Sequence, residues 1–255
     1  MSAVHLIVHG AVAELRLDNP TKMNAFTVEM LEQLADHLET IEHDAAFRAV
    51  MLTAEGDRAF CTGADINGWG DLNPAEFARR WVRYGHRIFD RLARLARPTV
   101  AVLNGHAFGG GLELAAACDI RVMAPKAALA LPEAAVGIVP GWSGTQRLMR
   151  LLPEPVVKEM ALFGHRIKAE RALAMGFAAA VDDNPRAAAE ALLERAVTLS
   201  PRAVEIAKSM IHAGANEDRG AMVEALGSAA IAASDDRQEG VAAFREKRKT
   251  DFTGR

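Results

Sequence analysis

The 255-residue chain predicts a mixed α/β fold made of successive strand–strand–helix units and completed by a region of helices alone. Two observations lead to this prediction. Short apolar strand patterns alternate with helical patterns through the first two thirds of the chain, although no sequence repeat is evident. After that, only helical patterns follow, beginning at Pro185, Pro201, Glu217 and Asp235. We therefore predict a strand–strand–helix core at residues 1–190 and a helical region at residues 191–255.

The composition is that of an ordinary globular protein, with 50% hydrophobic and 25% charged residues. The formal net charge of -3 gives no overall attraction to nucleic acid or to an anionic membrane. Cys61 and Cys118 are too few for a disulfide framework and lack metal-ligand spacing. No stretch of about 20 uncharged apolar residues indicates a membrane span. These features predict a cytoplasmic protein.

The first third of the chain predicts three strands and a helix. Strands are expected at 4–8 and 12–17, on either side of a turn at Gly10. A helix is expected after Thr27, a good N-cap, because apolar residues recur there at helical spacing. These residues are Met30, Leu31, Leu34, Leu38 and Ile41. A buried strand at 49–52 precedes the small-residue segment 59–66, which we interpret as a site-bearing loop at a strand end.

A long helix is expected from Asn73 and Pro74 to about Leu95, because proline favours the first helical position. One side of it is apolar and therefore faces the core. Arginines line the neighbouring side, at Arg80, Arg83, Arg87, Arg91 and Arg94. The favoured interpretation is a solvated or salt-bridged flank, and the alternative is a surface that binds phosphate, RNA or a partner.

A strand at 98–103 runs into the glycine-rich stretch 104–119, which we expect to become helical. The next strand is expected at 119–123. Residues 127–131 are predicted to pair with it across a turn at Pro125 and Lys126. After Pro153 helical patterns prevail, with one short strand expected at 177–181.

Glu113 is a single carboxylate in an apolar run that follows three glycines at 109–111. A helix that is apolar on every side is normally buried, and an ionised carboxylate is costly there unless it is paired or hydrogen-bonded. Free N–H groups at a helix start form a positive pole, and glycines let a ligand approach closely. The pattern predicts backbone donors that bind an oxygen beside an acid or base. The alternative is an acid that only complements the helix dipole.

Glu133 has the same setting, as a lone acid after Pro132 in the largely apolar segment 131–148. Considered alone, it is equally a helix-capping acid. Two carboxylates that face one pocket could hold a water between them. One would take the proton of that water while the other delivers a proton to carbon, provided that their pKa values differ. His106, beside the glycines, is equally consistent with lining this pocket and with packing.

Other chemistries fit the sequence less well. The segment 141–144, Gly-Trp-Ser-Gly, lacks the second spacer of a G-x-S-x-G nucleophile elbow. The glycines at 105–111 do not follow the G-x-G-x-x-G pattern of dinucleotide-binding folds. His5 and His9 share a strand face but have no third ligand nearby, so we interpret them as a surface pair and predict no metal site.

Five segments, in family order, together resemble the crotonase superfamily of enoyl-CoA hydratases and isomerases. They are 19–25, 59–66, 104–119, 132–148, and 235–240 with Phe244, Lys247 and Arg248. The resemblance covers nearly the whole chain. It implies a right-handed coil of ββα units with a C-terminal helical trimerisation region, assembled as a homotrimer or homohexamer. It also implies a role in fatty acid metabolism, such as β-oxidation.

The resemblance further implies an enoyl-CoA hydratase site. The backbone N–H groups of Ala64 and Gly110 would form an oxyanion hole for the thioester oxygen. Glu113 would be the base that activates water, and Glu133 the acid that protonates the α carbon. Coenzyme A would be part of the substrate, with no other cofactor. The residues expected to bind the substrate are Lys22, Ala25, Asp65, Ile66, Gly141, Trp142 and Lys247, with the two lysines near the CoA phosphates and Gly141 leaving room for the water.

The chain departs from the family pattern at two places. Asn67-Gly68-Trp69 stands where a charged residue is common, and Trp142-Ser143 replaces small residues. Trp69 or Trp142 either lines the acyl pocket, which would suit an aromatic or short substrate, or packs in the core. Alternative functions are a CoA-thioester isomerase, a specialised lyase of the same superfamily, or an RNA-binding relative, which the negative net charge opposes.

Overall fold

The computed structural model describes residues 2–215 and 219–255. They fall into two compact units that divide between Val204 and Glu205. The expected helix start at Glu217 lies outside the described residues. The predicted division of roles at residues 190 and 191 stays a prediction.

The first unit contains two sheets, and the chain passes between them several times. The six-stranded sheet has the order β1-β2-β3-β5-β7-β10, and the four-stranded sheet has the order β4-β6-β8-β9. The strands of the first are β1 (Ala3–His9), β2 (Val12–Asp18), β3 (Ala49–Ala54), β5 (Thr99–Leu103), β7 (Ile120–Met123) and β10 (Ala180–Val181). Those of the second are β4 (Ala59–Cys61), β6 (His106–Phe108), β8 (Ala128–Ala130) and β9 (Ile167–Lys168).

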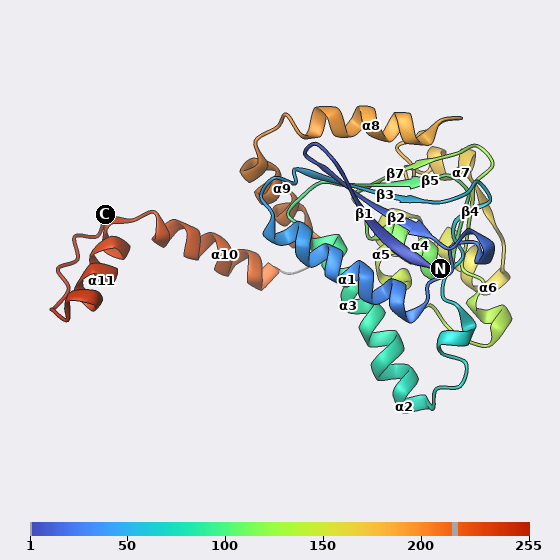
Figure 1. The fold of residues 1–255 in the computed structure, drawn as a ribbon, viewed down its shortest axis with the longest axis horizontal. Helices are drawn as coiled ribbons and strands as arrows, with labels where there is room; N and C mark the ends of the chain where they lie inside the picture. Colours follow the sequence, from blue (N-terminus) through green and yellow to red (C-terminus); the bar gives the residue numbers. More distant parts are fainter. Residues whose placement is uncertain (1, 216–218) are drawn as a thin grey trace. The chain divides into compact units, whose positions relative to one another are not determined.

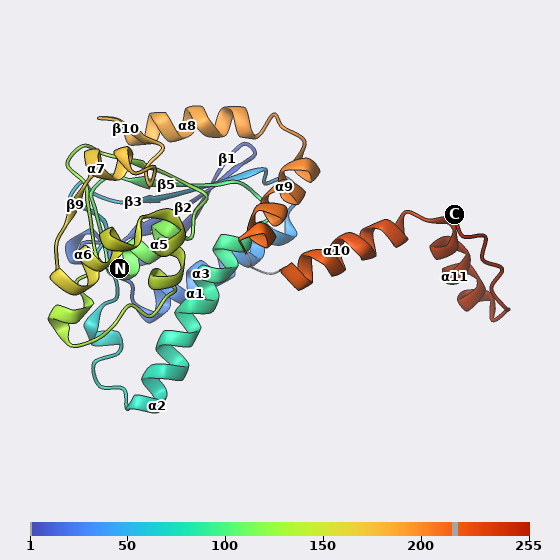
Figure 2. The ribbon, with the colours of Figure 1, turned by 180° about the vertical axis from the view of Figure 1, so that it is seen from behind.

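Helices cover both faces of the larger sheet (Figure 1). On one face, Leu193 of α8 (Pro185–Ala196) packs with Met51 and Val100. On the other face lie α1 (Val28–His43) and α3 (Arg83–Arg94), as the reverse view also shows (Figure 2). Because parallel strands covered on both sides must be apolar on both sides, β3 begins with four consecutive apolar residues, 49–52.

The remaining helices are short in the first unit and longer in the second. In the first unit they are α2 (Pro74–Glu76), α4 (Gly110–Ala116), α5 (Gly144–Leu151), α6 (Glu154–Phe163) and α7 (Ala169–Ala174). Residues Pro201–Gly214 form α9, which includes the point of division, and α10 (Arg219–Ala232) and α11 (Asp235–Glu246) follow. None of the described helices is long and apolar enough to cross a membrane.

Most of the predicted elements are confirmed. The strands at 4–8, 12–17, 49–52, 98–103 and 119–123 are present within a residue or two. Thr27 caps α1, because its hydroxyl accepts a hydrogen bond from the Met30 N–H (3.2 Å). The five apolar residues predicted for that helix are all buried.

The predicted pairing of residues 127–131 with 119–123 is wrong. β8 lies in the other sheet, between β6 and β9, while β7 is flanked by β5 and β10. A short turn can join the two strands of a hairpin, and it can equally lead the chain from one sheet into another. Since both edges of β7 are occupied by parallel strands, the chain turns the corner here.

The predicted helix from Asn73 to Leu95 is interrupted. Residues Phe77–Val82 form a π-helical turn between α2 and α3. Three of the arginines expected on its flank pair with acids: Arg91 with Glu42, Arg94 with Asp90, and Arg80 with Glu76. These pairs favour the salt-bridged interpretation over a nucleic-acid surface.

Candidate active site

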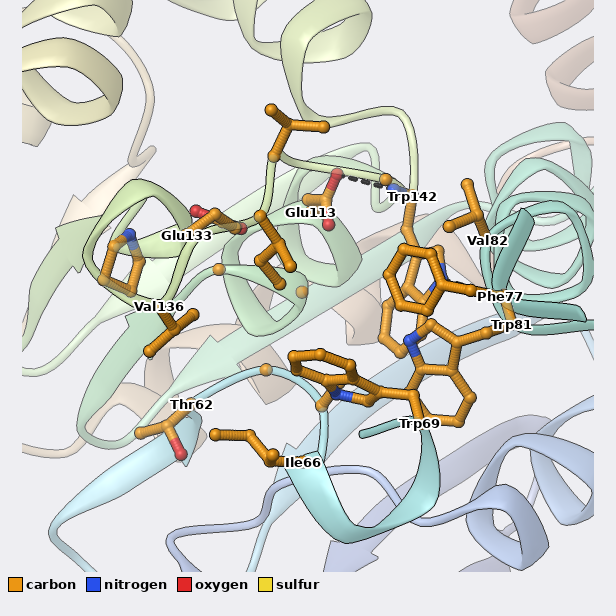
Figure 3. Close-up of a pocket in the computed structure, with 18 of the residues that line it drawn as sticks. Thr62, Ile66, Trp69, Phe77, Trp81, Val82, Glu113, Glu133, Val136 and Trp142 are labelled. Carbon is orange, nitrogen blue, oxygen red and sulfur yellow. Dashed lines mark hydrogen bonds between the residues drawn. The ribbon is translucent and has the colours of Figure 1, made fainter. Parts of the chain in front are cut away.

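One cavity of about 230 Å³ in the first unit collects most of the predicted site residues (Figure 3). Its walls come from loops that follow strands of the smaller sheet and from the π-helical turn. The lining residues are Thr62, Gly63, Ala64, Ile66, Trp69, Phe77, Trp81, Val82, Gly109, Gly110, Glu113, Pro132, Glu133, Ala135, Val136, Ile138, Val139, Gly141 and Trp142. The two glutamates are the only titratable side chains among these lining residues.

Glu113 lies in the first turn of α4 and is 2% exposed. Its Oε1 accepts hydrogen bonds from the backbone N–H groups of Trp142 (2.8 Å) and Gly144 (2.6 Å). Burial raises the pKa of this carboxyl, while those N–H groups and the nearby charge of Arg147 oppose the rise. The alternative in which Glu113 only complements the dipole of its helix is therefore incomplete, because backbone N–H groups of a separate loop also bind its carboxylate.

That loop has an unusual backbone at Ser143, which is a buried non-glycine residue with φ of 78°. The Ser143 hydroxyl is hydrogen-bonded to Nδ1 of His86 on α3 (2.8 Å). The next residue must be glycine, because a Cβ at Gly144 would lie 2.7 Å from Oε1 of Glu113. The left-handed turn thus directs two N–H groups, one on either side of Ser143, at the same carboxylate oxygen.

Glu133 begins a short 3-10 helix after Pro132 and is 8% exposed. Burial raises its pKa to about 7; its own backbone N–H opposes the rise, and the negative charge of Glu113 adds to it. Its Oε2 atom is buried and has no hydrogen-bond partner in the described part of the chain. A carboxyl with a pKa near 7 is only partly ionised at neutral pH, so both its acid and its base form are present there.

Ala64 and Gly110 line the same cavity. Phe26 pairs with the residues on either side of Ala64, which leaves the N–H of Ala64 directed away from that pairing. Gly110 is the first residue of α4, where N–H groups have no partner within the helix. No backbone carbonyl of the described residues accepts a hydrogen bond from either N–H. Gly63 brings the two segments together, since a Cβ there would lie 3.2 Å from the Gly110 nitrogen.

Seven of the eleven predicted site residues line the cavity: Ala64, Ile66, Gly110, Glu113, Glu133, Gly141 and Trp142. Four do not. Asp65 and Lys22 form an ion pair with each other (2.6 Å) beside the cavity loop, and Ala25 is buried next to Phe26. Lys247 ends α11 in the second unit. His106 does not line the cavity, because its ring stacks on Phe108.

The apolar wall of the cavity was largely missed by the sequence analysis. Phe77 and Trp81 belong to the apolar side of the helix that was predicted to face the core, and both do pack in or against the core; the π-helical turn also presents both to the cavity. Val136 and Val139 line it as well and are 54% and 78% exposed. Their signal was available, since apolar residues in a segment rich in glycine and proline with no helix or strand pattern often border a binding site.

Both tryptophans that depart from the family pattern line the cavity. Trp69 lies against Phe77, with ring centroids 5.5 Å apart. Trp142 serves in packing as well, because its ring contacts those of Phe26, Phe89 and Trp81. Trp142 therefore both lines the cavity and packs in the core, and its place in an acyl pocket stays a prediction.

The chain has the mixed α/β fold of the crotonase superfamily of enzymes. The profile of the enoyl-CoA hydratase/isomerase family matches residues 8–255, and the chain belongs to this family. A short-chain-enoyl-CoA hydratase of Clostridium acetobutylicum is 33% identical, over 98% of this chain and 97% of its own. A crotonyl-CoA hydratase of Syntrophomonas wolfei is also 33% identical, over 94% of each chain. The crystal structure of an enoyl-CoA hydratase from Bacillus anthracis superimposes with a TM-score of 0.81 at 32% identity, covering 99% of both chains.

Proposed function

We propose that this protein is an enoyl-CoA hydratase, which adds water across the α,β double bond of an enoyl-CoA thioester. The observation that carries the proposal is the pair Glu113 and Glu133: two buried acids on one otherwise apolar cavity, each with a raised pKa. Burial and mutual repulsion keep the pair from ionising fully, so one acid and one base are present together. The names of the Clostridium and Syntrophomonas relatives agree with this chemistry.

Each glutamate has a role that its surroundings support. Glu113, held by two N–H groups, is the base: it takes a proton from water as the water oxygen bonds to the β carbon. The electron pair of the double bond moves to the thioester oxygen, giving an enolate. Glu133 then gives its proton to the α carbon, and the carbonyl re-forms. Gly141, beside Glu113 on the cavity wall, leaves room for the water.

The enolate oxygen would accept hydrogen bonds from the N–H groups of Ala64 and Gly110. Their position on the cavity, free of backbone acceptors in the described residues, supports this role. Fixed donors aimed at developing charge commonly supply the largest part of a rate enhancement, with about 3 kcal/mol of barrier lost per donor removed. Coenzyme A enters as part of the substrate, and no other cofactor is required. Lys22 and Lys247 are proposed contacts for its phosphates, with Ala25, Asp65 and Ile66 binding the substrate beside the oxyanion hole.

The direct test is incubation with crotonyl-CoA, followed by the loss of enoyl absorbance and by product mass. Hydration adds the mass of one water, whereas isomerisation leaves the mass unchanged. Glu113→Gln and Glu133→Gln are each expected to lower kcat by about 100-fold or more, while circular dichroism stays that of the wild type. Full activity in both variants would show that the assigned roles are wrong.

A homotrimer or homohexamer is proposed as the assembly. The support comes from α10, which carries apolar residues around its whole circumference, including Val223 and Ile231. Both residues are more than half exposed in the single chain. A helix of this kind is normally covered, and a second copy of the chain is the proposed cover.

A further inference from the structure

The position of the two acids fixes the direction in which an acyl group would lie, if the proposed function holds. The α carbon must lie near Glu133 and the β carbon near Glu113. The substituent on the β carbon therefore points beyond Glu113. Figure 3 shows Trp142, Val82 and Phe77 on the side of Glu113 away from Glu133. These residues face whatever group the β carbon carries.

Trp142 fills the deepest part of this wall. Its side chain is 3% exposed, borders the cavity on one side and contacts the core rings of Phe26 and Phe89 on the other. The indole lies between two glycines, because a Cβ at Gly110 would be 2.8 Å from the ring and a Cβ at Gly85 would be 2.3 Å from Nε1. Removing the indole would join its volume to the cavity.

The helix opposite Trp142 is shaped around the indole. Gly85, in the first turn of α3, costs about 1 kcal/mol relative to alanine in a helix and has no turn to make there. Just before it, the π-helical turn Phe77–Val82 interrupts the regular helix, and the Trp81 carbonyl accepts the Nε1–H of Trp142 (3.3 Å). π-helical turns are commonly found at functional sites. Gly85, the π-helical turn and the Trp81 carbonyl thus all lie around the indole of Trp142 and leave room for it.

We propose that Trp142 sets the depth of the acyl pocket, so that the enzyme prefers enoyl-CoA thioesters with a short hydrocarbon group on the β carbon. The wall beyond Glu113 carries no charged side chain, which suits a hydrocarbon. The indole occupies the space between α3 and α4 that a longer chain would need. Trp142 donates a hydrogen bond to Glu113 from its backbone N–H, which any residue at this position would supply, so the side chain can change specificity without taking part in the proton transfers.

The test compares kcat/KM for crotonyl-, hexenoyl- and decenoyl-CoA in the wild type and in Trp142→Ala. The wild type should favour crotonyl-CoA. In the variant, the ratio of decenoyl to crotonyl activity should rise by about tenfold or more, because each methylene placed in an apolar pocket contributes to transition-state binding. Trp142→Phe should give a smaller shift in the same direction and serves if the alanine variant does not fold. Leu162→Ala, at an exposed position on α6, is the matched control and should leave the ratio unchanged.

Each other outcome has a distinct meaning. A wild type that hydrates none of the three thioesters would overturn the proposed function itself. A wild type that hydrates all three equally, or a Trp142→Ala variant whose activities fall in parallel, would overturn only the role of Trp142. Cinnamoyl-CoA is assayed beside the three thioesters as an aromatic substrate. If the wild type preferred it to crotonyl-CoA, the short-chain preference would be overturned in favour of an aromatic one.

Discussion

Glu133 is held in the fold at a cost that depends on pH. Its carboxyl has a pKa of about 7 in the folded chain, against an ordinary value of 4.5, chiefly because it is buried. Between these two pH values the folded chain keeps the proton that the unfolded chain releases, so the stability of the fold decreases as pH rises through this window. Above the window the full cost is present.

Glu133→Gln removes the ionisable group, so comparing it with the wild type measures how much the ionised Glu133 destabilises the fold. Near pH 8 the variant is expected to be more stable than the wild type by about 2 to 3 kcal/mol, and near pH 4 the difference should disappear. Urea unfolding at the two pH values measures it. A stability difference that is the same at both pH values would show that Glu133 is not destabilised by its charge. If the expected difference is found, the same carboxyl both supports activity and lowers the stability of the fold.

Ser143 is the second residue at which conformation and chemistry meet. Its φ of 78° costs an L-residue about 1 kcal/mol, and the hydrogen bond to His86 holds it in place. Ser143→Ala keeps the Cβ but removes the hydroxyl, so the loop should relax and withdraw the N–H groups of Trp142 and Gly144 from Glu113. We expect kcat to fall about tenfold with little change in KM.

Ser143→Gly is the matched control for that prediction. Glycine also lacks the hydroxyl but adopts positive φ at no steric cost. It should therefore retain most of the wild-type kcat if backbone geometry is what the serine provides. Equal losses in the two variants would instead assign the effect to the hydrogen bond with His86 alone.

Among the elements, α3 and the loop that carries Trp142 depend on each other. Gly85→Ala in the wild type forces a methyl group into the indole and should destabilise the protein by about 1 to 3 kcal/mol. In the Trp142→Ala background the clash is gone, and the same change should stabilise it by about 1 kcal/mol through helix propensity. Thermal unfolding of the four proteins measures the coupling. Additive effects would mean that the two positions do not interact.

The sequence predicted elements whose signals are local and periodic. The strands at 4–17 and the helix after Thr27 depend on residue spacing and on a cap, so both were found. The break in the helix at Phe77–Val82 was not found, because no local pattern marks it and its side-chain partner Trp142 lies 60 or more residues away. The pairing of β8 failed for the same reason, since the partner of a short strand is chosen by tertiary packing.

The candidate site could be predicted in part. Glu113 and Glu133 were conspicuous as lone acids in apolar, glycine-rich segments, and the structure places both on one cavity. The loop that binds Glu113 was not predicted, because serine rarely adopts positive φ and the sequence around Ser143 therefore does not indicate a left-handed turn. Val136 and Val139 carried a signal, but only their exposure in the folded chain gives it meaning.

At the scale of the first unit, the alternation between sheets explains how the site is assembled. Strands β4, β6 and β8 neighbour one another in the smaller sheet, and the chain leaves them at Thr62, Gly109 and Leu131. Each exit contributes residues to the cavity: Ala64 after β4, Gly110 and Glu113 after β6, and Glu133 after β8. Parallel neighbours end at the same edge of a sheet, so residues about 70 positions apart in the sequence meet there.

The second unit gives the last prediction, which concerns assembly. Ile231 lies on α10 and is 57% exposed, a position at which an isolated chain gains nothing from isoleucine. Burial against another copy would contribute about 2 kcal/mol per side chain, whereas a lysine there would place an unpaired charge in the interface. We expect the wild type to have three or six times the chain mass by light scattering, and Ile231→Lys to shift it to smaller species. Ala187→Lys adds the same charge at an exposed position of α8 in the first unit and is a control for charge alone. A wild-type protein that remains monomeric at micromolar concentration would contradict the proposed assembly, and an Ile231→Lys variant of unchanged mass would exclude this part of α10 from the interface.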